Sequence, residues 1–325
     1  MKSKKQQKKT SIKSSILVLL LIAILLIAST YAWFTSNKQV TVSSLNVNVA
    51  AKNGLQISVD GTNWKSIISN EDITGATATY AAAVNQIPTV MEPVSSGKTV
   101  TDGKLNVYYG TVDSTSGAPK LTATKATEVA GDTSVNAKFI VFDLFLKVDA
   151  ATQIDLTTGS NVLAKDGSPD KGLQNASRVA FVTEGNTASG STLATIQGLN
   201  GGDATTTKIW EPNYDVHTTA GVSAAYDTYA KTTTVGPDAA QLTYNGIIAP
   251  IETGVALNSA DATYFAPVTP DYSTKKAMAT TTFTTLQPGI TKVRVYMWVE
   301  GQDVDCENGA SGTDITYNLQ WAVHE

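Results

Sequence analysis

The chain has 325 residues, enough for one large or two ordinary domains with a sizeable core. Only 16% of the residues are charged, against a usual share of about 25%, and about one residue in seven is threonine, which favours β-sheets. Six lysines lie in the first 13 residues, and the rest of the chain has 18 basic and 28 acidic residues, a net charge of −10. Because binding to nucleic acid needs clustered basic residues, we do not expect nucleic acid as a partner.

The N-terminal segment has the pattern of an export signal. The lysine-rich start is followed by thirteen uncharged apolar residues, 16–28, and then by small and polar residues. A basic start, an apolar stretch of roughly 7–15 residues and a small-x-small end form a secretory signal peptide. Thr30 and Ala32 supply the small residues, so we predict a hydrophobic signal helix within a signal peptide at residues 1–32, cleaved after Ala32.

An uncleaved membrane anchor is the alternative for the same segment. No charge occurs between Lys13 and Lys38, and a span needs about 20 residues, so the uncharged stretch is long enough. In both cases the lysines precede the apolar stretch, which places the rest of the chain outside the cell. The protein is therefore expected to be secreted or displayed on the surface, touching a membrane only through this segment.

The segment 33–52 is predicted to contain a long strand that follows the cleavage site. Apolar and polar residues alternate over 38–49, and Ser43-Ser44 shifts the alternation by one residue. Such a shift is the effect of a β-bulge. The apolar positions, which we take as candidate assembly residues, are Val40, Val42, Leu45, Val47 and Val49.

Several later segments alternate apolar and polar residues with the period of a half-buried strand. One of them, 139–148, is apolar on one face and partly apolar on the other, which is typical of a central strand. Residues 60–63 form a predicted hairpin turn, and 179–183 a short strand. We expect an all-β, antiparallel sandwich at 53–325, one elaborated domain with a variable middle region of inserted loops at about 160–280. The remaining strand segments are 55–59, 293–299 and 315–323.

No arrangement of residues typical of an active site is present in the sequence. The two histidines, His217 and His324, have no second ligand at metal spacing, and no zinc-peptidase, nucleophile-elbow or phosphate-loop motif occurs. Cys306 is the single cysteine, so no disulfide can form within the chain. We therefore expect no enzyme and no organic cofactor.

One acidic cluster is a candidate calcium site. Calcium takes about six to eight oxygen ligands, and alternating acids in a loop supply some of them. The spacing does not match an EF-hand loop, and the alternative is a solvated acidic turn between two strands. The candidate ligands are Asp303, Asp305, Glu307 and Asn308.

Three stretches resemble a known family of exported proteins. The junction TYAWF at 30–34 with its following strand is similar to precursors of the TasA/camelysin family, which are processed by a dedicated signal peptidase of the SipW type. The stretch VRVYMWVEGQDVDCENG at 293–309, and IWEPNYDVH at 209–217, also resemble segments of Gram-positive proteins with such signals. The resemblance implies a jelly-roll-like β-sandwich in an extracellular fibre or biofilm matrix.

The resemblance also implies a mode of assembly. The mature N-terminal strand leaves its own subunit and completes the sheet of the next copy, which gives a head-to-tail homopolymer, alone or with other matrix proteins. This hypothesis expects residues 33–49 to be poorly packed in a monomer. The alternative is a monomeric or membrane-anchored adhesin that binds a glycan or host ligand through exposed aromatic residues. The aromatic residues considered for that role are Trp210, Tyr214, Tyr226 and Tyr229.

Overall fold

The computed structural model confirms that the protein is mostly β, with 51% strand and 9% helix in several mainly antiparallel sheets. The predicted signal peptide at 1–32, including Thr30 and Ala32, lies outside the described residues. No helix within the described ranges is long and apolar enough to cross a membrane. The structure describes residues 39–49, 54–113, 120–134, 137–165, 173–212, 244–256, 261–271, 283–303, 305–306 and 312–324.

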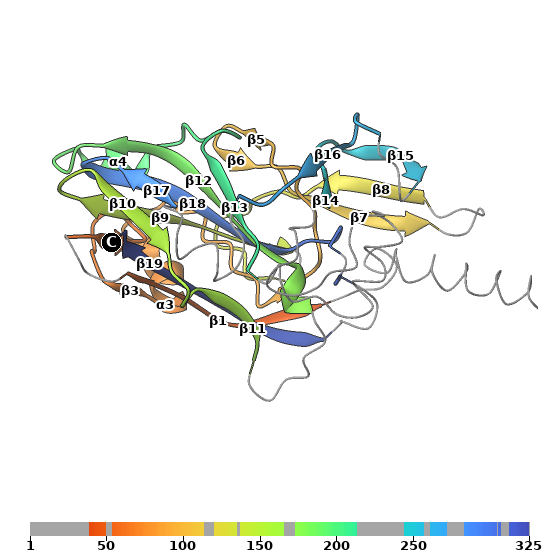
Figure 1. The fold of residues 1–325 in the computed structure, drawn as a ribbon, viewed down its shortest axis with the longest axis horizontal. Coiled ribbons are helices and arrows are strands. Elements are labelled where there is room, and N and C mark those ends of the chain that lie inside the picture. The colour runs from red at the N-terminus through yellow and green to blue at the C-terminus, as the bar shows by residue number, and fades with distance from the viewer. Residues whose placement is uncertain are drawn as a thin grey trace, which may run out of the picture.

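The first of two large sheets contains both the first and the last described strand. Strand β1 pairs in parallel with β19, and the other ladders of this sheet are antiparallel. In Figure 1, β1, β19 and β11 run along the lower side of the molecule. The order is β17 (Thr284–Leu286), β10 (Thr152–Leu156), β19 (Thr313–Val323), β1 (Val40–Val49) and β3 (Ile67–Ile68), with β11 (Asn161–Ala164) on β19 and β4 (Val90–Met91) on β1.

The second large sheet is antiparallel throughout, and its long strands run above β1 and β11 in Figure 1. Its order is β13 (Thr207–Trp210), β12 (Ser177–Thr187), β18 (Gly289–Val299), β9 (Ile140–Val148) and β2 (Gln56–Ser58).

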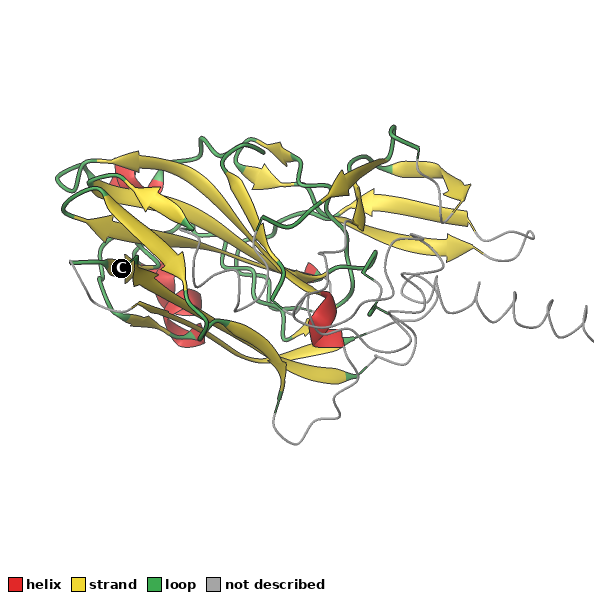
Figure 2. Cartoon of the chain, viewed as in Figure 1, coloured by secondary structure: helices red, strands yellow, loops and turns green. Residues whose placement is uncertain are grey.

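Smaller sheets and short helices complete the fold (Figure 2). The three-stranded and one of the two-stranded sheets lie together at one end of the molecule, on the right of Figure 1. The sheets are β15 (Ile251–Ala256), β8 (Lys120–Lys125) and β7 (Tyr108–Asp113); β14 (Tyr244–Ile247) and β16 (Phe265–Val268); and β5 (Val100–Thr101) and β6 (Lys104–Leu105). The helices among the described residues are α3 (Asn70–Gly75), α4 (Leu193–Gln197) and the 3₁₀ turns η1 (Ala76–Ala78) and η3 (Leu173–Ala176).

The main core lies between the two large sheets, and a second apolar layer covers the opposite face of the second sheet. Strand β9 shows this arrangement: Phe142 and Leu144 belong to the main core, whereas Val141 and Phe145 belong to clusters on the other face. The prediction of a central strand at 139–148 is therefore confirmed. Side chains of this strand are buried on both faces, so the polar ones among them must find partners within the protein.

Most of the predicted strands are present, and two details are informative. The register of β1 against β19 shifts between Val42 and Ser44, which confirms the bulge predicted from Ser43-Ser44. The short strand predicted at 179–183 is wrong in length, because β12 continues to Thr187 through a second bulge and carries buried polar residues. The chain reverses at 60–63, as predicted, so that Ile57 of β2 pairs antiparallel with Lys65.

Candidate functional site

The candidate assembly strand β1 is paired unequally on its two edges. Toward β19 it forms an uninterrupted parallel pairing from Val40–Thr313 to Val49–Trp321, apart from the bulge. Toward the other edge it pairs only at its ends, through Val47 and Asn48 with β3, and through Val40 and Thr41 with β4. Within the described chain, no strand is paired with residues 43–46 on that edge.

The side chains of β1 nevertheless belong to the core of their own chain. Val40, Leu45, Val47 and Val49 are buried in the main core, and Val42 packs against it half-buried. The expectation that this segment is poorly packed in a monomer is therefore wrong for residues 40–49. The same alternation that would fit a neighbour's sheet also fits the chain's own sheet, since both need apolar side chains every second residue.

On its solvent side, β1 carries polar residues that face β19. Asn46 is exposed, and its partner in the register is Asn318. Asn48 Nδ2 donates a hydrogen bond to Asn318 Oδ1 at 3.1 Å. These polar residues therefore mark the β1–β19 seam at the surface.

The proposed calcium cluster is partly used for an ion pair. Asp303 Oδ2 lies 2.6 Å from Arg178 Nη2, and Asp303 Oδ1 accepts a hydrogen bond from the backbone N–H of Asp305. Glu307 and Asn308 lie outside the described residues. Among the residues that are described, no group of three or more His, Cys, Asp and Glu side chains could hold a metal ion. The carboxylate of Asp303 thus acts as a counter-ion to Arg178.

Arg178 holds a second carboxylate in a fully buried cluster. Glu211 Oε1 is 2.8 Å from Arg178 Nη2, and the guanidinium lies over the ring of Tyr244, 5.4 Å from its centre. Burial alone would lower the pKa of Arg178, but the charges of Glu211 and Asp303 outweigh it and raise this pKa above its usual value. The guanidinium therefore stays charged, and it links the ends of β12, β13 and β18.

Glu300 lies next to this cluster and follows β18 directly. It is buried and accepts hydrogen bonds from Trp298 Nε1 at 2.9 Å and from the backbone N–H of Gln302 at 3.0 Å. Burial raises the pKa of Glu300 to about 7, although the hydrogen bonds to its carboxylate act in the opposite direction and lower this pKa. Glu300 therefore titrates near neutral pH inside the folded protein.

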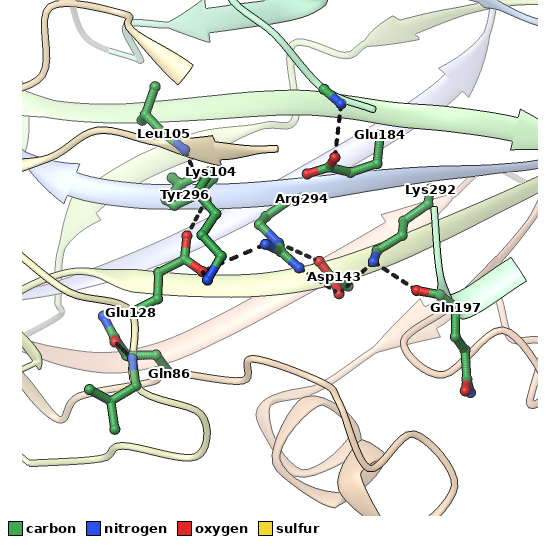
Figure 3. A network of polar contacts seen from close by, with 12 residues as sticks. Gln86, Lys104, Leu105, Glu128, Asp143, Glu184, Gln197, Lys292, Arg294 and Tyr296 are labelled. Atoms are coloured by element: carbon green, nitrogen blue, oxygen red, sulfur yellow. Dashed lines mark hydrogen bonds and ion pairs between the residues drawn. The ribbon is translucent and has the colours of Figure 1, made fainter. Parts of the chain in front are cut away.

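A separate buried polar network lies on the face of the second sheet that points away from the main core (Figure 3). Arg294 of β18 forms a two-point ion pair with Asp143 of β9, with Nε–Oδ1 at 2.8 Å and Nη2–Oδ2 at 3.3 Å. Lys292 Nζ lies 3.2 Å from Asp143 Oδ2. Burial would raise the pKa of Asp143, but the charges of Arg294 and Lys292 lower it below its ordinary value.

Tyr80 connects the lysine and the aspartate of this network. Its hydroxyl donates to Asp143 Oδ2 at 2.7 Å and accepts from Lys292 Nζ at 3.0 Å. Lys292 Nζ also donates to the backbone carbonyl of Gln197 at 3.0 Å. Each proton of the ammonium thus has an acceptor, in a site where Lys292 is 2% and Asp143 0% exposed.

Glu184 of β12 lies on the same face of the sheet. Its Oε2 accepts from the backbone N–H of Gly202 at 3.0 Å, while its Oε1 is buried without a hydrogen-bond partner. Burial raises the pKa of Glu184 to about 7. A side chain at Gly103, whose φ is +71°, would come within 2.6 Å of Oε2, so glycine is required for this close approach.

Sequence reasoning missed this network, although a signal for it exists. Asp143 lies in the middle of a strand whose residues are otherwise apolar from 139 to 146, and Lys292 and Arg294 lie among the apolar residues of the neighbouring strand. A charged residue in a strand buried on both faces needs a partner. The pairing of β9 with β18, which no local pattern specifies, brings these charges together.

The aromatic residues expected for a ligand-binding surface do not form one in the described chain. Trp210 is 1% exposed and belongs to the main core, against the exposed position that the adhesin alternative requires. Tyr214, Tyr226 and Tyr229 lie outside the described residues. Trp210 therefore contributes nothing to an exposed aromatic surface.

Comparisons with known proteins return no relative. No protein-family model matches the chain, and neither the curated proteins nor the solved structures contain a significant match.

Proposed function

We propose that the protein is a secreted or cell-surface structural subunit, whose copies join head to tail in an extracellular fibre or biofilm matrix. In this proposal a SipW-type signal peptidase releases the chain, and the fold is a jelly-roll-like sandwich. Strand β1 of one copy takes the place of β1 in the next. The observation that carries the proposal is the pairing of β1, which is continuous with β19 but partial on its other edge.

The energetics of this exchange follow from the identity of the two sites. A β1 strand that leaves its own groove loses its ladder with β19 and the burial of Val40, Leu45 and Val47. The same ladder and the same burial are restored in the neighbour, so few contacts change in total. Backbone hydrogen bonds supply the affinity and the alternating side chains fix the register.

The direction of the chain in such an assembly is also defined. Because β1 runs parallel to β19, the incoming strand is expected to run parallel to the β19 of the acceptor. Each copy then offers one strand and one groove at different places on its surface. Such a heterologous contact propagates into a filament unless its rotation closes a ring.

A disulfide across the β1–β19 seam tests the proposal. We would replace Asn46 and Asn318 by cysteine in a Cys306→Ala background, because these two asparagines are register partners on the solvent side. Adjacent strands lie about 4.8 Å apart, which is compatible with a disulfide. Oxidation of monomers should lock β1 in its own chain and prevent filaments, as seen by electron microscopy, and reduction should restore them.

Oxidation after assembly gives the complementary result. In filaments the two cysteines of a seam belong to different copies, so a non-reducing gel should show a ladder of covalent multimers. The Asn46→Cys single variant, in the same background, is the matched control and should show no ladder. Locked monomers that assemble as well as reduced ones would rule out exchange of β1.

A further inference from the structure

The polar network on the second sheet brings a lysine and an aspartate together in an unusual setting. Lys292 and Asp143 lie diagonally across the neighbouring strands β18 and β9, two register positions apart, because Asp143 pairs directly with Arg294 whereas Lys292 pairs with Phe145. The distance from Lys292 Nζ to Asp143 Oδ2 is 3.2 Å, and both side chains are almost completely buried. The amine is thus held close to a carboxyl group, away from bulk water.

Burial of these groups as ions is costly. Removing an ammonium and a carboxylate from water carries a large desolvation penalty for each ion, and their mutual attraction offsets this only partly. An amide between them would remove both charges. Nζ lies 3.2 Å from Oδ2, an oxygen bonded to the Cγ that it would attack, so the two reacting groups are already in contact.

We propose that Lys292 and Asp143 form an intramolecular amide bond, which is an isopeptide link between β18 and β9. Nζ of Lys292 attacks Cγ of Asp143, the Nζ–Cγ bond forms and the Cγ–Oδ2 bond breaks. The ammonium and the carboxylate together become one amide and one water. Nζ loses two protons, both of which leave with Oδ2, so no other reactant is needed.

The contacts of Tyr80 provide a path for one of these protons. Its hydroxyl accepts from Lys292 Nζ at 3.0 Å and donates to Asp143 Oδ2 at 2.7 Å. A proton can therefore pass from the nucleophile to the departing oxygen through Tyr80. The other proton has a direct route over the 3.2 Å between Nζ and Oδ2. Tyr80 thus serves as the acid–base group of the step.

Arg294 is placed to stabilise the other oxygen. When Nζ adds to Cγ, negative charge develops on Asp143 Oδ1, which receives a hydrogen bond from Arg294 Nε at 2.8 Å. A fixed cation at that position stabilises the tetrahedral intermediate. The same contact keeps Asp143 ionised at first, so the step begins with proton transfer within the pair.

The amide product would also keep its hydrogen bonds. Its N–H can donate to the carbonyl of Gln197, which already accepts from Lys292 Nζ, and its oxygen stays on Arg294. Arg294 would lose the charge of Asp143 but keep that of Glu128, whose Oε2 lies 3.6 Å from Nη1.

The mass of the folded full chain tests the proposal. An isopeptide bond lowers the intact mass by one water, and tryptic digestion should give a branched peptide containing residues 143 and 292, uncut after Lys292. The mass of Lys292→Arg, which keeps the charge but does not condense, should match its sequence. Asp143→Asn should lose one ammonia instead of one water, and Tyr80→Phe should form the bond more slowly.

Each result decides between the bond and a simple ion pair. Wild-type protein at the full sequence mass, with normal cleavage after Lys292, would overturn the proposal whether or not the variants fold. Loss of water that persists in Lys292→Arg would also overturn it, because the reacting amine would then lie elsewhere. A branched peptide joining the two residues would establish the bond.

Discussion

Strands β1 and β9 occupy comparable positions in the two large sheets but are held in different ways. Both have long ladders on one edge, β1 with β19 and β9 with β18. Strand β9 is buried on both faces and carries Asp143, whose ion pairs reach two residues of β18, whereas β1 exposes Asn46 and has no ion pair of that kind in the described chain. The second sheet thus contains buried ion pairs between its strands, and the exchange of β1 that we propose would break no such ion pair among the described residues.

Removal of β1 should have the largest effect. A chain that begins at Lys52 lacks four buried apolar side chains, each worth about 1.5–3 kcal/mol of burial, so the free energy of unfolding should fall by several kcal/mol. Urea unfolding measures this loss. Hydrogen exchange should then show β19 amides losing protection while those of β9 retain most of theirs. Equal loss of protection in β9 and β19 would contradict the distinction between the two strands.

Replacement of Arg178 should be nearly as harmful, because it tests the charged scaffold of the second sheet. Arg178→Met leaves the carboxylates of Glu211 and Asp303 buried without their cation. Breaking a buried pair by removing one partner costs about 3–5 kcal/mol. Arg178→Lys, which keeps the charge but not the planar fork, should lose less. An unfolding midpoint of Arg178→Met equal to that of the wild type would show that this cluster does not stabilise the sheet.

The raised pKa of Glu300 predicts that the free energy of unfolding decreases as the pH rises. Its pKa is about 7 in the folded protein and ordinarily 4.5, so the folded state binds more protons between these values. The wild type should therefore lose stability as pH rises from 4.5 to 7, by on the order of 3 kcal/mol. Glu300→Gln should lack this part of the slope. Urea unfolding of both proteins below pH 4.5 and above pH 7 gives the difference, and parallel profiles would contradict the prediction.

The sequence predicts the individual strands of this fold better than it predicts which strands pair with one another. The bulge of β1 and the central position of β9 follow from alternation alone, because the side-chain period reports which face is buried. The pairing of β1 with β19 does not follow, since the partners are separated by most of the chain and no turn connects them. The full length of β12 does not follow from the sequence for a related reason: Glu184 is polar, and only the packing of distant segments shows that it is buried.

The smallest expected effect concerns the asparagine pair of the seam. Asn48→Ala removes the hydrogen bond to Asn318, which should lower monomer stability by about 0.5–1.5 kcal/mol. Asn318→Ala removes the same bond, together with one to the carbonyl of Gly159, so the double variant should be less destabilised than the sum of the two. If β1 is exchanged, Asn48 of one copy contacts Asn318 of the next copy. The same coupling energy between the two residues should then appear in the stability of filaments assembled from a mixture of the Asn48→Ala and Asn318→Ala proteins. A coupling present in monomers but absent from filaments would mean that β1 stays in its own chain, and that the unequal edges of this strand reflect only the boundary of the sheet.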